Sequence, residues 1–323
     1  MTDVSSHPSR REALKVGVAA AAGLAFAPWR SLAASERPWW RQGALITKTI
    51  PSSGRKIPVV GIGTNAYNLS AEARADLRDV MRRFVELGGS VYDTAHGYGR
   101  GESESVLGEL HSELGNRDRL FLVTKIMSGA DDAQGREQFA LSMERLKLST
   151  VDGLLIHNLN GVDPMMPVLQ EWKQAGKLTH LGISTSSNRQ YEPLTEYLKK
   201  YQLDLVQVDY SMGNRDAEPI LQLAKDRGTA VMVNVPFGGR RGASENFAKL
   251  ASTPLPGFAA ELGVTSWAQF FLKYIASHPA VTVIVPGTRR VRHVEDNLGG
   301  AMGQLPDAAM RRRMEQFYDA LPS

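Results

Sequence analysis

A three-part unit, made of an apolar segment, a polar loop and an amphipathic segment, occurs eight times between residues 59 and 299. The apolar segments are continuous rather than alternating, which is typical of strands whose two faces are both covered. Their predicted bounds are 59–63, 90–93, 120–125, 152–157, 180–184, 205–208, 230–234 and 281–285. Strict alternation of strands with helices favours a parallel sheet, and eight such units predict an α/β fold of the (β/α)8 TIM barrel type.

The amphipathic segments between these strands are predicted helices, because their apolar residues recur at helical spacing. They cover residues 71–87, 102–114, 133–146, 164–175, 189–200, 217–227, 259–277 and 291–299. A doubly wound open sheet is the alternative fold. It lacks support, since Gly61-Ile-Gly63 is followed by Thr64-Asn65-Ala66 and not by the rest of a G-x-G-x-x-G dinucleotide fingerprint.

Three segments lie outside the repeated units. Residues 45–63 contain two short strand-like segments around a Pro51-Ser-Ser-Gly54 turn, which predicts an N-terminal β-hairpin over the amino-terminal end of the barrel. Residues 307–321 predict an extra C-terminal helix packed outside it. Residues 238–257 are too long for an ordinary strand-to-helix loop, so they either cover the rim or form an irregular surface excursion. The barrel domain is expected to span residues 45–321.

The amino terminus has a pattern of its own. Arg10 and Arg11 precede a small-residue apolar run at 16–27, and Leu32-Ala-Ala34 offers a cleavage region. This order resembles a twin-arginine export signal; a frayed amphipathic helix is the alternative. The run of 12 residues is shorter than the ~20 that span a bilayer, so no stable membrane anchor is expected. We therefore expect residues 1–34 to be a twin-arginine signal peptide, the twin-arginine translocase to be a partner, and the protein to be periplasmic.

Charge and cysteine content narrow the possible partners. The net charge is +4 and no single element gathers the basic residues, so no nucleic-acid partner is expected. The chain has no cysteine. A chain without thiols is compatible with an oxidising compartment, although this is weak evidence by itself.

Polar side chains end three successive predicted strands. Asp93 ends the second strand and Tyr98 follows in a glycine-flanked turn, Lys125 ends the third, and His157 ends the fourth. Taken singly, each has an ordinary structural explanation. Asp93 can cap the following loop and Tyr98 can be a packed phenol. Lys125 can be half-exposed and His157 can donate to a backbone carbonyl. Because the carboxyl ends of parallel barrel strands meet on one face, the four together favour a catalytic site.

Their chemistry suits proton transfer to an oxygen atom. A tyrosine with a pKa near 10 is a reluctant acid at neutral pH. The ammonium of Lys125 is expected to lower the pKa of Tyr98, while Asp93 holds Lys125 in place and compensates its charge. His157 can orient or polarise the same oxygen.

Several stretches carry a family resemblance that covers residues 45–321. They are Val60-Gly-Ile-Gly-Thr64, Val91-Tyr-Asp-Thr-Ala-His-Gly-Tyr98, Val123-Thr-Lys125, Arg145-Leu-Lys-Leu148 with Val151-Asp-Gly-Leu-Leu-Ile-His157, Leu181-Gly-Ile-Ser184, Val206-Gln-Val208 and Val285-Pro-Gly-Thr-Arg-Arg290. In combination they resemble the aldo-keto reductase superfamily. The resemblance implies hydride transfer from a nicotinamide cofactor without a metal, with Tyr98 as proton donor and Asp93, Lys125 and His157 assisting.

The resemblance also implies where the cofactor binds. Ser184 and Gln207 would hold the carboxamide. Arg289, at the start of the helix predicted at 291–299, suits a 2′-phosphate, which favours NADP(H) over NAD(H). The full set of implied cofactor residues is Thr64, Ser184, Gln207, Asn234, Gly238, Gly287, Thr288, Arg289, His293 and Asn297. Two of these depart from the family pattern, because Asn234 stands where a tyrosine often stacks on the nicotinamide and His293 where arginine is common.

These observations predict an NADP(H)-dependent oxidoreductase that interconverts a small-molecule carbonyl and its alcohol. One alternative is a non-catalytic nucleotide-binding or redox-sensing barrel protein. Another is an aldolase-like barrel in which Lys125 forms a Schiff base.

Overall fold

The protein's computed structural model describes residues 43–239, 245–250 and 253–321. Eight parallel strands follow one another around a single sheet in chain order. The strands are β3 (Ile62–Gly63), β4 (Val91–Asp93), β5 (Phe121–Ile126), β6 (Val151–Ile156), β7 (Leu178–Ser184), β8 (Leu205–Asp209), β9 (Ala230–Asn234) and β10 (Val281–Ile284). Parallel bridges from Val60 to Ile284 and from Gly63 to Gly287 join the first strand to the last. The sheet is thus closed, which confirms the predicted (β/α)8 barrel.

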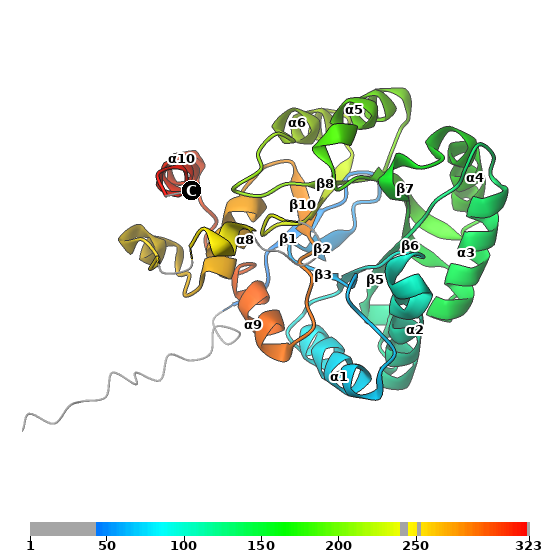
Figure 1. The fold of residues 1–323 in the computed structure, drawn as a ribbon, viewed down its shortest axis with the longest axis horizontal. Helices are drawn as coiled ribbons and strands as arrows, with labels where there is room; N and C mark the ends of the chain where they lie inside the picture. The colour runs from blue at the N-terminus through cyan, green and yellow to red at the C-terminus, as the bar shows by residue number, and fades with distance from the viewer. Residues whose placement is uncertain (1–42, 240–244, 251–252, 322–323) are drawn as a thin grey trace, which may run out of the picture. The chain divides into compact units, whose positions relative to one another are not determined.

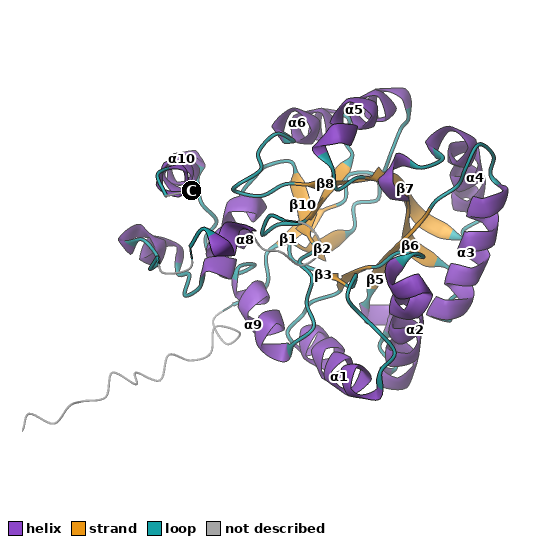
Figure 2. Ribbon diagram, viewed as in Figure 1, coloured by secondary structure: helices purple, strands orange, loops and turns teal. Residues whose placement is uncertain are grey.

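Helices surround the strands (Figure 1) and cover the outer face of the sheet (Figure 2). They are α1 (Ala71–Glu86), α2 (Glu102–Leu114), α3 (Ala133–Leu146), α4 (Val162–Gln174), α5 (Tyr191–Lys200), α6 (Glu218–Asp226), the short α7 (Glu245–Ala248), α8 (Trp267–Ala276), α9 (Val291–Gly299) and α10 (Ala308–Asp319). Helix α1 illustrates how the sequence sets an element. Ser70 caps its first turn by accepting from Ala73 N, and Leu77, Met81 and Phe84 recur at helical spacing on its buried face.

One predicted helix is divided in the structure. Residues 259–277 were expected to form one helix, but a 3₁₀ segment at Gly257–Leu262 ends before α8 begins at Trp267. Gly263 takes a left-handed conformation (φ 63°) and terminates the first part, as glycine does at no steric cost. Ser266 is extended and accepts from Gln269 N, so a new helix begins there.

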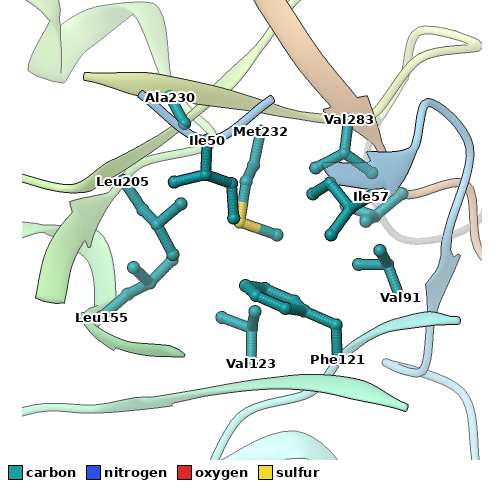
Figure 3. Close-up of a cluster of buried hydrophobic side chains, with 11 residues drawn as sticks. Ile50, Ile57, Val91, Phe121, Val123, Leu155, Leu205, Ala230, Met232 and Val283 are labelled. Atoms are coloured by element: carbon teal, nitrogen blue, oxygen red, sulfur yellow. The ribbon is translucent and has the colours of Figure 1, made fainter. Parts of the chain in front are cut away.

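The N-terminal hairpin lies where the sequence placed it. β1 (Thr47–Thr49) pairs antiparallel with β2 (Lys56–Pro58). Ile50 and Ile57 are buried in a cluster with the first residues of β4, β5, β8 and β9, namely Val91, Phe121, Leu205 and Ala230. Figure 3 shows these side chains gathered inside the barrel. The hairpin therefore plugs the amino-terminal end, and the opposite end is left for the loops that carry the site.

The C-terminal helix α10 lies outside the helices that surround the strands (Figure 1), as predicted. It packs on α8 through Phe317, whose ring stacks 6.0 Å from Trp267. Phe247 of α7 lies between Phe237 and Phe271, at 5.0 and 5.7 Å. The described part of the long segment after β9 is thereby attached to α8. The predicted signal at 1–34 lies outside the described residues.

Candidate active site

The four side chains predicted at successive strand ends meet around Lys125. Asp93 ends β4, Lys125 is near the end of β5, and His157 follows β6. Lys125 Nζ donates to Asp93 Oδ1 at 2.7 Å, to Thr94 O at 2.8 Å and to Tyr98 Oη at 3.5 Å. The rings of Tyr98 and His157 meet edge to face, with centroids 5.7 Å apart. The barrel thus brings together an acid, an amine, a phenol and an imidazole from three strand ends.

Burial sets the protonation chemistry of this group. Lys125 is 1% exposed; burial acts to lower its pKa, but Asp93 and Tyr98 together act against burial, and the pKa of Lys125 is raised. Burial also raises the pKa of Tyr98, and the opposing effect of Lys125 does not overcome it. The sequence-based expectation of a lowered pKa for Tyr98 was therefore wrong for the protein alone, because burial disfavours a phenolate more than one ammonium favours it.

His157 is uncharged at physiological pH. Burial, followed by the charge of Lys125, lowers the pKa of His157 to about 3. A neutral imidazole offers one N–H donor and one acceptor nitrogen. It can therefore orient a polar substrate atom without adding a second positive charge beside Lys125.

A turn with unusual backbone geometry carries Tyr98. His96 N donates to Lys125 O at 2.9 Å and Tyr98 N donates to Ala95 O at 3.0 Å, which holds the start of the turn to β5. Gly99, Arg100 and Gly101 then all have positive φ, at 58°, 59° and 100°. Arg100 is the costly member of this run, because a left-handed conformation strains a residue with a Cβ.

A group of amide and hydroxyl side chains lies toward the carboxyl ends of β7, β8 and β9. Asn234 Nδ2 donates to Thr185 O at 2.9 Å and to Gln207 Oε1 at 3.4 Å, and Ser184 Oγ donates to Ile156 O at 3.3 Å. Gln207 Nε2 and Asn234 Oδ1 are buried and have no hydrogen-bond partner within the described ranges. Buried polar atoms are nearly always paired, so one free donor and one free acceptor fit an amide ligand such as the nicotinamide carboxamide.

The predicted phosphate residues cluster before and within α9. Asn297 Nδ2 donates to Thr288 Oγ1 at 3.1 Å, and both side chains are buried, which fixes the loop. Gly287, Arg289 and His293 are exposed beside the start of the helix. The unpaired amides of a helix N-terminus together with a guanidinium suit a phosphate group.

Two predicted cofactor residues have other contacts. Thr64 is buried, and its hydroxyl lies 2.7 Å from Ser103 Oγ and donates to Asp93 O at 3.1 Å. Gly238 has φ 70°, and its N–H donates to Val235 O at 3.0 Å. The sequence reasoning missed Ser103, which also lies 2.8 Å from Thr94 Oγ1. The sequence marks Ser103 only as a small hydroxyl residue that follows a predicted strand, and many residues fit this description.

The described residues contain no group of three or more histidine, cysteine, aspartate or glutamate side chains able to hold a metal ion. Within these same ranges, none of the helices combines the length and apolarity needed to cross a bilayer.

Comparison with known proteins identifies the family to which the chain belongs. The sequence pattern of the Aldo/keto reductase family matches residues 59–317, and the chain belongs to this family. It is 23% identical to an aldo-keto reductase [NADP(+)], yakc, of Schizosaccharomyces pombe, over 82% of this chain and 89% of the relative. It is 27% identical to methylglyoxal reductase YeaE of Escherichia coli, over 84% and 95%. A Klebsiella pneumoniae aldo-keto reductase solved with NADPH shares the fold, with a TM-score of 0.67, 22% identity and coverage of 85% and 96%.

Proposed function

We propose that this aldo/keto reductase interconverts a small carbonyl compound and its alcohol by NADP(H)-dependent hydride transfer. The observation that carries the proposal is Lys125 Nζ lying 2.7 Å from Asp93 Oδ1 and 3.5 Å from Tyr98 Oη, with His157 beside the phenol ring. The names of relatives agree, since one is an NADP(+) aldo-keto reductase and another a methylglyoxal reductase.

When bound, NADPH would supply the hydride for the carbonyl carbon. Tyr98 Oη gives its proton to the carbonyl oxygen, which becomes the alcohol hydroxyl. Lys125, held by Asp93, is placed to stabilise the resulting phenolate by charge and by a hydrogen bond. His157, being neutral, orients the carbonyl oxygen. In the oxidative direction the same groups take the proton back.

The residues that would hold the cofactor follow from the unpaired atoms of the site. Gln207 Nε2 and Asn234 Oδ1 complement an amide, and Ser184 lies on the neighbouring strand end. Arg289 and the start of α9 suit the 2′-phosphate, so NADP(H) is preferred and NAD(H) is the weaker alternative.

Replacing the phenol is the direct test of the reaction. In Tyr98→Phe we expect carbonyl-dependent NADPH oxidation, followed by absorbance, to fall ~10²- to 10⁴-fold, since general acid catalysis is lost. NADPH affinity, measured by quenching of protein fluorescence, should stay within about twofold of wild type because the ring remains. Undiminished turnover by Tyr98→Phe with several carbonyl substrates would refute the role of Tyr98.

The rival functions give different results in the same assays. Wild-type protein that binds NADPH but turns over no member of a broad carbonyl panel would favour the nucleotide-binding or redox-sensing barrel. A covalent adduct trapped on Lys125 by borohydride would instead support Schiff-base chemistry.

We also propose that the chain has two parts, a twin-arginine signal at residues 1–34 and the barrel at 45–321, and that the translocase exports it to the periplasm. The support is the order of Arg10, Arg11, the apolar run at 16–27 and Leu32-Ala-Ala34. The test is cell fractionation of the wild type and of an Arg10→Lys/Arg11→Lys variant. A variant that still reaches the periplasm would contradict this route.

A further inference from the structure

We propose that Arg145 is a positioning residue whose guanidinium clamps the turn that carries Tyr98. Arg145 lies on α3, and within the described residues no hydrogen bond or ion pair joins it to the four site residues, so its effect would pass through the backbone of the turn. The inference rests on the proposed function, in which the position of Tyr98 Oη decides the rate.

The guanidinium contacts both ends of the turn. On one side, Arg145 Nη1 donates to His96 O at 3.4 Å and to His96 Nδ1 at 3.3 Å. On the other side it packs against Gly101, where an added methyl group would lie 2.2 Å from Arg145 Cζ. Tyr98 lies between these two contacts along the chain. The Arg145 side chain thus contacts the turn both before and after the proton donor, Tyr98.

The hydrogen bonds define the protonation of His96. Arginine can only donate, so Nδ1 of His96 is the acceptor and carries no proton. Ser142 Oγ lies 3.3 Å from the same nitrogen. Burial, followed by the charge of Arg145, lowers the pKa of His96, in agreement with a neutral ring.

A buried carboxylate fixes the guanidinium in turn. Glu104 is 0% exposed, and its Oε2 lies 3.6 Å from Arg145 Nη1. Its other oxygen accepts from Thr124 Oγ1 at 2.6 Å, and Thr124 directly precedes Lys125 in β5. Burial raises the pKa of Glu104, and the hydrogen bond from Thr124 and the charge of Arg145 act against this rise, so the guanidinium and the carboxylate favour each other in this place. The clamp therefore ties the turn of Tyr98 to the strand of Lys125.

The turn needs such support for two reasons. Arg100 is left-handed between two left-handed glycines, and a residue with a Cβ keeps this conformation only when surrounding contacts impose it. The contact from Lys125 Nζ to Tyr98 Oη is already 3.5 Å, the long end of the hydrogen-bond range. A displacement of about 1 Å in a reacting group can cost ~10²-fold in rate.

The experiment compares two arginines of one helix. Arg145→Met should lower kcat about 10- to 100-fold while the Kd for NADPH stays within about twofold, because only the proton donor is displaced. Arg145→Lys should recover part of kcat. The matched control is Arg136→Met, which removes exposed ion pairs with Asp132 and Glu171 at 2.7 and 3.4 Å and should leave kcat unchanged.

Two further measurements separate positioning from stability. The double variant Arg145→Met/Glu104→Gln removes both charges, keeps no buried unpaired carboxylate, and should show the same loss of kcat at a temperature where it is folded. In ¹³Cζ-tyrosine spectra, assigned with Tyr98→Phe, the Tyr98 signal should shift in Arg145→Met and not in Arg136→Met. This signal needs no turnover, so an inactive wild type whose Tyr98 signal still responds to Arg145 would refute the proposed function and support the clamp.

Folded Arg145→Met with wild-type kcat, or with an unmoved Tyr98 signal, would overturn the clamp. The clamp would also be overturned if Arg145→Met lost kcat, NADPH affinity and thermal stability together and regained all three on cooling, because that pattern indicates general destabilisation.

Discussion

At the scale of residues, burial governs the charges of the candidate site, because it raises the pKa of Tyr98 and lowers the pKa of His157. Asp93, Lys125 and His157 could be predicted as neighbours because the ends of parallel barrel strands share one rim. The raised pKa of Tyr98 could not, because it depends on how deeply the folded loops bury the phenol. Arg145 was also missed as a site element, since its contacts with the Tyr98 turn depend on how α3 packs.

The depressed pKa of His157 predicts a loss of stability in acid. Unfolded chains hold this proton below about pH 6.5, whereas the folded protein takes it up only near pH 3. The unfolded state therefore gains protons first, and the stability associated with neutral His157 falls as pH drops from 6.5 toward 3. From neutral pH to about pH 5, His157→Gln should lose about 1–2 kcal/mol less unfolding free energy than wild type in urea titrations. Equal losses would contradict a buried, neutral His157.

At the scale of elements, periodicity predicted the repeated units well but missed one interruption. The helix expected at 259–277 is broken because Gly263 is left-handed and Ser266 caps a new start. Apolar spacing continues across this break, so periodicity alone could not reveal it. Helix α9 begins at Val291, where it was predicted. The anion site there stays a prediction, which comes from the glycine, threonine and arginine before the helix.

Helix α9 gives a prediction on cofactor choice. Arg289→Gln should weaken NADPH binding by about tenfold and leave NADH binding nearly unchanged, because a charge-assisted hydrogen bond to the 2′-phosphate is lost. Fluorescence titrations with both cofactors measure the difference. Arg312→Gln, an exposed arginine of α10, is the control and should alter neither affinity. An equal loss for NADPH and NADH would place the 2′-phosphate elsewhere.

At the scale of the whole barrel, stability and chemistry occupy opposite ends. Ile50 and Ile57 fill the amino-terminal end, while Tyr98, Lys125 and His157 come from the opposite ends of the strands. Both ends could be predicted because strict alternation of strands with helices implies that all the strands run in one direction. The same separation means that packing at the plug can be weakened without disturbing the reacting groups.

Ile57→Ala should reduce the unfolding free energy by about 2–5 kcal/mol, because it leaves a cavity in the plug. The kcat of the folded variant should match wild type. Lys56→Ala, an exposed change on the same strand, should stay within about 0.5 kcal/mol of wild type. A large fall in kcat for folded Ile57→Ala would show that the two ends are coupled.

The bridges from Val60 to Ile284 and from Gly63 to Gly287 make the earliest strand depend on the latest. A nascent chain that ends before residue 281 has an open sheet with two unpaired edge strands. The loop proposed to grip the cofactor phosphate follows that final strand, at Gly287 to Arg289. Cofactor binding by this loop would then require the last strand to be in place, so a bound dinucleotide would indicate that the ring of strands has closed.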